Sequence, residues 1–130
     1  MEESPFKGKT GVRRIVRAAG YSLEGLASAY VHEDAFRQEV LFVLLMGIVA
    51  FVLEVTALSR ALMIASLLLV LIVELLNSSV EAAVDRISLE QHGLSKRAKD
   101  FGSAAVMLAL LLCAGTWVAI AWPWVALLLR

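Results

Sequence analysis

Three long apolar segments are separated by shorter polar ones along this chain. The charge-free runs are 40–53, 61–73 and 101–129. A helix that crosses a bilayer needs about twenty mainly apolar residues. The third run exceeds this length by itself, and the first two reach it when flanking residues are included. We therefore expect membrane helices at about 36–58, 61–86 and 100–129.

The segment before the first apolar run has a different period. Its apolar residues recur mostly at steps of three and four, and its arginines occupy other faces. The apolar positions are Val12, Ile15, Val16, Ala19, Leu23, Leu26 and Tyr30. This pattern predicts an amphipathic helix at about 10–35, which either lies in the membrane interface or packs on the bundle. The chain is thus expected to be an all-α membrane protein with a single domain over 1–130.

Charge changes this picture mainly through its distribution. Twelve basic and twelve acidic residues cancel, so no net positive field favours nucleic acid. Lys and Arg gather before the first membrane helix and between the second and third. Because basic residues stay on the cytoplasmic side, we expect a cytoplasmic N-terminus and second loop, and an external C-terminus. The first twenty residues lack an apolar core, so no cleavable signal peptide is expected. The single cysteine excludes a disulfide within the chain.

The second apolar segment ends in the polar stretch VELLNSSVEAAVDR, which begins at Val73. On a helix, its Glu74, Asn77, Glu81 and Asp85 fall within an arc of about 80°. An acid well inside a membrane span costs a few kcal/mol. Polar contacts between helices would explain the asparagine, but two carboxylates on one face need protons, a cation or a base nearby. The stripe is therefore a candidate site.

Further charges should collect at the same depth. They are Glu33, Asp34 and Glu39 near the first membrane helix, and Lys99 and Asp100 at the start of the third. Carboxylates beside lysines suggest Mg²⁺ with a polyphosphate, because Mg²⁺ is usually held by one or two carboxylates plus substrate phosphates. This chemistry favours a phosphotransferase.

Four blocks in order resemble the small trimeric prokaryotic diacylglycerol kinases of the bacterial inner membrane, over about Arg14 to Trp122. The blocks are Ala18–Ser22, Ala35–Glu39, Val73–Arg86, and Arg97–Asp100 with Gly102–Ala105. The resemblance implies a homotrimer with sites shared between protomers, each chain giving one interfacial and three membrane helices. It also implies phosphorylation of 1,2-diacylglycerol by ATP, which yields phosphatidic acid for phospholipid metabolism.

The same resemblance assigns roles by position. Glu74 is implied as the general base, supported by Asn77, and Glu33 and Glu81 as the Mg²⁺ ligands. The implied ATP residues are Arg14, Tyr21, Glu33, Glu81, Glu90, His92, Lys99 and Asp100. The implied lipid residues are Arg14, Ala18, Ala19, Gly20, Tyr21, Ser22, Ala35, Phe36, Arg37, Gln38, Glu39, Arg60 and Ser103. The chain departs from the familiar pattern at Leu23, Glu24 and Gln91.

Two other readings stay open at this point. An undecaprenol kinase of the same superfamily would keep the acids and the asparagine of the stripe but accept a long isoprenoid alcohol. A small oligomeric transporter or channel would instead use Glu74 as an intramembrane carboxylate on an ion pathway. The blocks Ala18–Ser22 and Ala35–Glu39 resemble the diacylglycerol branch, and clustering of acids with Lys99 at one interface disfavours a pore.

Overall fold

The computed structural model describes residues 11–130, which form four α-helices and, within that range, no strand. The helices are α1 (Val12–His32), α2 (Asp34–Val52), α3 (Ala57–Ile87) and α4 (Gly93–Leu128). The last three are long and apolar enough to cross a membrane. The expected all-α membrane fold is confirmed. Lys7 and Lys9, which contributed to the expected orientation, lie outside the described residues.

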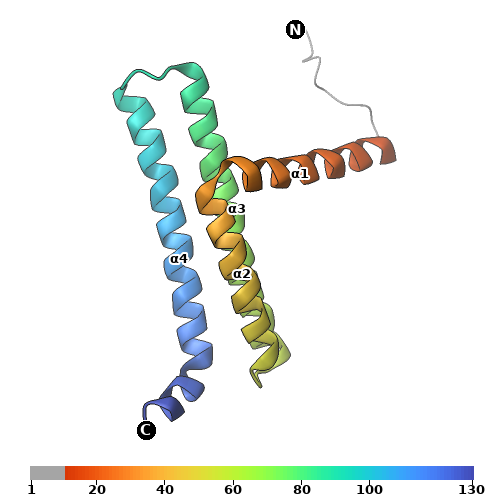
Figure 1. Ribbon diagram of the computed structural model, residues 1–130, viewed down its shortest axis with the longest axis vertical. Helices are drawn as coiled ribbons and strands as arrows, with labels where there is room; N and C mark the ends of the chain where they lie inside the picture. The colour runs from red at the N-terminus through yellow and green to blue at the C-terminus, as the bar shows by residue number, and fades with distance from the viewer. Residues whose placement is uncertain (1–10) are drawn as a thin grey trace.

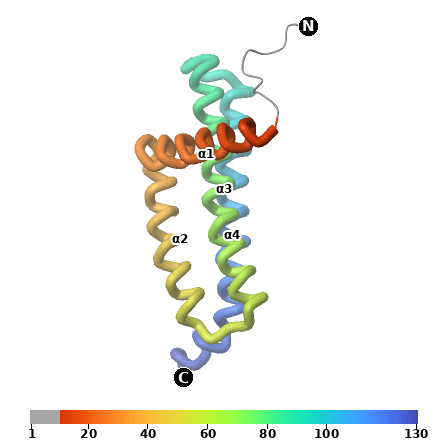
Figure 2. The backbone as a smooth tube through the Cα atoms, turned by 90° about the vertical axis from the view of Figure 1, so that its right-hand side faces the viewer, coloured from red at the N-terminus to blue at the C-terminus, as the bar shows by residue number. Residues whose placement is uncertain are grey.

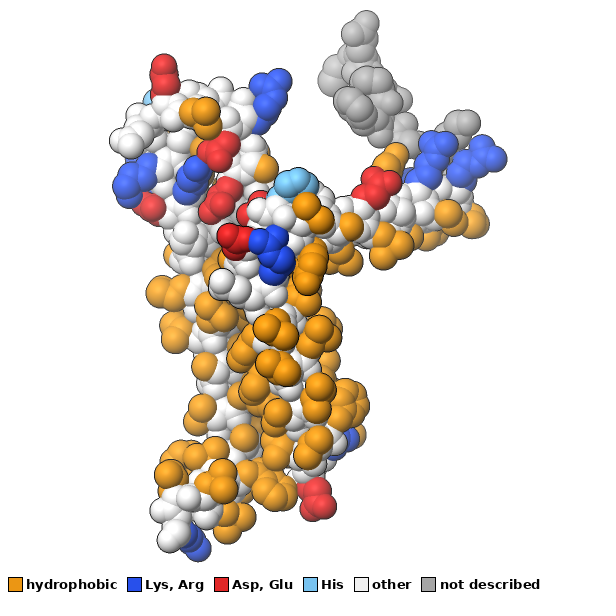
Figure 3. Space-filling model, viewed as in Figure 1, with side chains coloured by type: hydrophobic (Ala, Val, Ile, Leu, Met, Phe, Trp, Pro, Cys, Tyr) orange, Lys and Arg blue, Asp and Glu red, His pale blue; other side chains and the backbone are white. Residues whose placement is uncertain are grey.

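Helices α2, α3 and α4 run side by side, whereas α1 runs crosswise to them (Figures 1 and 2). In α1 only Ala29 is buried, and large apolar side chains such as Val12, Ile15 and Val16 are exposed. Apolar side chains gather on the face of α1 turned toward the apolar part of the bundle, and charges on the opposite face (Figure 3). This arrangement favours the interfacial placement of α1, since a helix packed on its own bundle would bury its apolar side chains.

The core lies along one face of α3. Met63, Leu67 and Val70 are buried there, and they pack with Ala50 of α2 and with residues of α4. The Trp117 indole Nε1 donates a hydrogen bond to the Met63 carbonyl at 3.3 Å, which ties α4 to α3. Most other large apolar side chains are exposed, and they form an apolar belt on the face of the bundle that Figure 3 shows. Such a belt suits contact with lipid or with neighbouring chains.

Two helix ends differ from the expected bounds. The first membrane helix ends at Val52 rather than near 58, because Leu53 is extended (φ −68°, ψ 136°) and the Thr56 hydroxyl caps α3 by accepting from the Ser59 N–H at 3.1 Å. The third begins at Gly93 rather than near 100. The Leu94 N–H donates to the His92 imidazole Nδ1 at 3.1 Å, so the helix starts in a stretch expected to be loop.

Helices α3 and α4 are longer than a bilayer requires. Their 31 and 36 residues correspond to about 46 and 54 Å at 1.5 Å per residue. The hydrocarbon core of a bilayer is about 30 Å thick. The ends joined by residues 88–92 therefore extend beyond the apolar layer, and charged side chains concentrate there (Figure 3).

Candidate active site

The polar stripe of α3 passes from buried to exposed along the helix. Glu74 is 5% exposed, Glu81 is half-buried and Asp85 is exposed. The Asn77 amide Nδ2 donates a hydrogen bond to Glu81 Oε1 at 3.3 Å, while its oxygen Oδ1 is buried with no partner among residues 11–130. At 1.5 Å per residue, Glu81 lies about 10 Å beyond Glu74 along the axis. The stripe thus connects the apolar layer with the polar end of the bundle.

Carboxylates from two other segments lie close enough to Glu74 to interact with it electrostatically. Glu39 of α2 has a buried oxygen, Oε2, without a partner among the described residues, and it interacts electrostatically with Glu74. Glu74 also interacts with Glu81 and with Glu33, which stands between α1 and α2. Several negative charges in one region of low polarity require protons, a cation or cationic side chains to balance them.

The donor set suits a Mg²⁺ ion that arrives with its substrate. Within residues 11–130, no three Asp, Glu, His or Cys side chains converge closely enough to hold a metal by themselves. Mg²⁺ commonly takes one or two carboxylates and completes its shell with phosphate oxygens and water. Glu81 and Glu33 can supply carboxylate oxygens of this kind, and the phosphates of a nucleotide would supply the rest.

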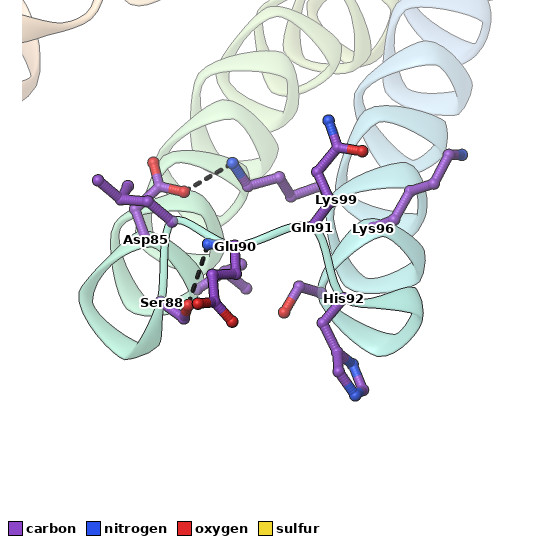
Figure 4. A pocket seen from close by; sticks show the side chains of 10 residues that line it. Asp85, Ser88, Glu90, Gln91, His92, Lys96 and Lys99 are labelled. Carbon is purple, nitrogen blue, oxygen red and sulfur yellow. Dashed lines mark hydrogen bonds and ion pairs between the residues drawn. The ribbon is translucent and has the colours of Figure 1, made fainter.

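A pocket of about 310 Å³ lies between the end of α3 and the start of α4 (Figure 4). Its wall includes Glu90, His92 and Lys99, three of the residues expected to bind nucleotide. The Lys99 ammonium donates a hydrogen bond to Asp85 Oδ1 at 2.7 Å, across from α4 to α3. This bond raises the pKa of Lys99, which precedes the charge-free part of α4, so the ammonium stays charged. The pocket therefore offers a cation near its acidic and imidazole groups.

Sequence reasoning missed part of this pocket. Ser88 and Lys96 also line it, and the Ser88 Oγ accepts from the Glu90 N–H at 3.0 Å. The Lys96 ammonium forms an ion pair with the Asp100 carboxylate at 2.6 Å. Asp100, which was predicted to bind nucleotide, therefore lies beside the pocket wall. The spacing of three between Lys96 and Lys99 could have indicated a second lysine on the same face of α4.

The predicted residues of α1 lie apart from the acids of α3 within one chain. Arg14, Tyr21 and the residues from Ala18 to Ser22 are all exposed along α1, and the Ser22 hydroxyl only donates to the carbonyl of Ala18 at 2.8 Å. Arg14 precedes His32 by eighteen residues, which is about 27 Å of helix. That distance is far longer than an arginine side chain. In this conformation, the chain does not bring Arg14 to the acids of its own α3.

The first turns of α2 carry the second group of predicted lipid residues, Ala35 to Glu39. Ala35 and Gln38 are exposed there, whereas Phe36 is 3% exposed. The Arg37 side chain is held by three contacts. Its Nη1 donates to the carbonyls of Tyr30 and Val31 at 2.9 and 2.8 Å, and its Nη2 forms an ion pair with Asp34. Arg37 thus fixes the corner between α1 and α2.

Arg60 and Ser103 lie at different ends of the bundle. Ser103 is exposed on α4, and its neighbour Gly102 contacts Asn77. Arg60 is near the start of α3, where its guanidinium donates to the carbonyls of Ala50 and Leu53 at 2.9 and 3.1 Å. It closes the end of α2, and the structure does not bring it to the other lipid residues.

The chain is similar to known proteins over most of its length. The family described as prokaryotic diacylglycerol kinase matches residues 20–121. The diacylglycerol kinase of Pseudomonas aeruginosa is 58% identical over 120 residues, covering 92% of this chain and 98% of the relative. Those of Escherichia coli and Haemophilus influenzae are 53% and 46% identical, covering 87% and 83% of this chain and 93% and 92% of each relative. The chain belongs to the prokaryotic diacylglycerol kinase family.

Proposed function

We propose that this protein transfers the γ-phosphoryl group of ATP to the primary hydroxyl of 1,2-diacylglycerol, forming phosphatidic acid and ADP at the cytoplasmic face of a bacterial inner membrane. The observation that carries the proposal is the continuous polar stripe of α3, with a buried Glu74 at one end and the loop pocket near the other. Glu74 follows Ala57, the first residue of α3, by seventeen residues, or about 26 Å along the helix. This length is shorter than the hydrocarbon core of a bilayer, about 30 Å, so Glu74 lies within the apolar layer but near its cytoplasmic edge. A lipid hydroxyl can reach such a depth, and a nucleotide can reach the pocket.

Glu74 acts as the general base in this proposal. Its carboxylate takes the proton of the lipid hydroxyl while the hydroxyl oxygen bonds to the γ-phosphorus and the bond from that phosphorus to the ADP oxygen breaks. Asn77, which donates to Glu81, supports the base. Because phosphoryl transfer depends on alignment and charge neutralisation more than on covalent help, the cationic Lys99 contributes by stabilising charge on the phosphates.

Glu33 and Glu81 would hold Mg²⁺ together with the phosphates. When bound, the ion would supply charge neutralisation on the transferring group. Both carboxylates interact electrostatically with Glu74, which supports a shared negative region able to receive a cation. Loss of turnover on chelation of Mg²⁺, with recovery on its return, is the expected result. Full turnover without a divalent cation would contradict the assignment.

We also propose a homotrimer in which neighbouring chains complete each site. The support is the separation of Arg14 and Tyr21 from their own α3, together with the exposed apolar belt. If sites are shared, mixing inactive Arg14→Ala chains with inactive Glu74→Gln chains should restore part of the turnover, because some sites receive both intact groups. No recovery in demonstrably mixed oligomers would contradict shared sites.

The decisive experiment is phosphorylation by purified protein in mixed micelles with labelled ATP. Labelled phosphatidic acid from 1,2-diacylglycerol is the expected product. Undecaprenol offered at the same mole fraction tests the related kinase, and preferential labelling of undecaprenol would overturn the assignment. Solute flux in proteoliposomes without ATP consumption would instead favour a transporter.

A further inference from the structure

Helix α4 passes close to Asn77 of α3 at Gly102, a residue with no role in the proposed chemistry. A Cβ atom at this position would collide with Asn77 Oδ1 and lie 3.2 Å from its Cγ and 3.8 Å from its Cα. At the other glycines of residues 11–130, an added Cβ would meet nothing within 4 Å. Gly11 differs in having a positive φ of 88°, which itself favours glycine. Among the described glycines, a side-chain clash is therefore confined to Gly102, where α4 passes Asn77.

This contact fixes how the Asn77 amide lies. Its nitrogen donates to Glu81 and its buried oxygen faces the Gly102 backbone, without a hydrogen-bond partner among the described residues. An unpaired buried carbonyl costs about 1–3 kcal/mol, so packing must hold the amide in this orientation. Asn77 is one helical turn from both Glu74 and Glu81. Its orientation therefore affects the proposed base and the proposed metal ligand together.

We propose that Gly102 is a positioning residue for phosphoryl transfer, because its missing side chain leaves the space in which the Asn77 amide lies between Glu74 and Glu81. This inference rests on the proposed function. An added methyl group would have to turn the amide away or push α3 and α4 apart. The colliding atom is the far end of a side chain, so rotation of the amide is the easier response. Rotation breaks the hydrogen bond to Glu81 and leaves the helices packed.

Gly102→Ala tests the proposal, and Gly115→Ala is its matched control. Gly115 lies in the same helix, is exposed, and has free space where its Cβ would be. Both changes add the same methyl group and should raise helix propensity by about 1 kcal/mol. A loss of turnover seen in Gly102→Ala but not in Gly115→Ala must therefore come from the contact of the added methyl group with Asn77.

The kinetic constants should separate positioning from packing. Gly102→Ala should lower kcat by about 30-fold or more, since small misplacements can cost about 100-fold. Its thermal stability should match that of Gly115→Ala, and its kcat and KM changes should follow those of Asn77→Ala. Gly102→Ala combined with Asn77→Ala should lose no more than about 3-fold beyond Asn77→Ala alone, because residues acting through one contact are not additive.

Several outcomes would overturn the proposal. A kcat for Gly102→Ala near that of Gly115→Ala would do so, as would losses that multiply in the double variant. If Gly102→Ala fails to fold, a folded double variant with the kcat of Asn77→Ala supports the proposal, and an unfolded one assigns Gly102 to helix packing.

A spectroscopic measurement separates this inference from the proposed function. The side-chain amide signal of Asn77 in ¹⁵N-labelled protein should move in Gly102→Ala and stay in place in Gly115→Ala, whatever the substrate. An unmoved signal refutes the positioning role. Wild-type protein that fails to phosphorylate diacylglycerol refutes the proposed function instead.

Discussion

Replacement of Glu74 by glutamine removes a proton acceptor while it preserves side-chain shape. Glu74 is 5% exposed and belongs to the inward face of α3, so a smaller residue would also leave a cavity. Glutamine avoids this second effect. Since an ionised acid is costly at membrane depth, the neutral amide should not lower the free energy of unfolding. A fall in turnover would therefore report the chemistry of the carboxylate.

The size of the loss follows from the burial of the site. A positioned general base typically contributes about 10²- to 10⁴-fold, or about 2.7–5.4 kcal/mol at 1.36 kcal/mol per tenfold. Water has little access to a side chain that is 5% exposed, so solvent cannot readily replace the base. We expect a loss in kcat of about 10³-fold, near the middle of that range. KM for MgATP should change little, because Glu81 lies about 10 Å further along the helix.

The assay is steady-state formation of phosphatidic acid in mixed micelles, with Glu54→Gln as the control. Glu54 is exposed at the opposite end of the bundle, between α2 and α3, and the same chemical change there should leave kcat within about 2-fold, as expected for a surface position. Near-normal turnover by Glu74→Gln would refute the assignment of the base. A comparable loss in Glu54→Gln would show that charge removal acts through assembly or folding.

Three further changes test other parts of the structure. Glu81→Gln should raise KM for MgATP about tenfold and increase the Mg²⁺ concentration required, because it removes a charged ligand worth about 1.4 kcal/mol or more; unchanged titrations with ATP and Mg²⁺ would contradict this. Asp85→Asn should lower stability by less than about 1 kcal/mol, since the side chains of Lys99 and Asp85 are 41% and 50% exposed, and the effect should shrink in high salt when unfolding is measured in detergent. Trp117→Phe should lose about 0.6 kcal/mol of stability with kcat unchanged, because it removes the hydrogen bond to Met63; a large fall in kcat would argue for a role beyond packing.

The three membrane helices could be predicted because a bilayer imposes length and apolarity on each segment separately. Their exact ends could not, since local caps decide them. Leu53 and Val55 are apolar, yet the Thr56 hydroxyl caps a new helix that starts at the next residue. His92 likewise starts α4 in a stretch whose composition suggests a loop. Hydropathy averages over many residues and does not register one capping side chain.

Contacts between helices were the second feature that sequence could not provide. The partners of Arg60, Lys99 and Gly102 depend on the depth and rotation of neighbouring helices, which no single segment determines. Arg60 was assigned to a lipid site by resemblance, and its hydrogen bonds to the end of α2 could not be predicted from that assignment. Gly102 was visible only as part of a block, and its contact with Asn77 required both helices in place.

The stripe of α3 was predictable because one period governs both the core and the site. The positions at steps of three and four along this face are Met63, Leu67, Val70, Glu74, Asn77 and Glu81. The first three are buried against α2 and α4, so continuation of the same spacing must carry the polar members toward the same neighbours. The same face of α3 thus packs the core at Met63, Leu67 and Val70 and carries the carboxylates from Glu74 onward, two turns beyond Leu67. This continuity explains why Glu74 is buried although it is an ionisable residue, and why a residue without a side chain suits α4 where it passes Asn77.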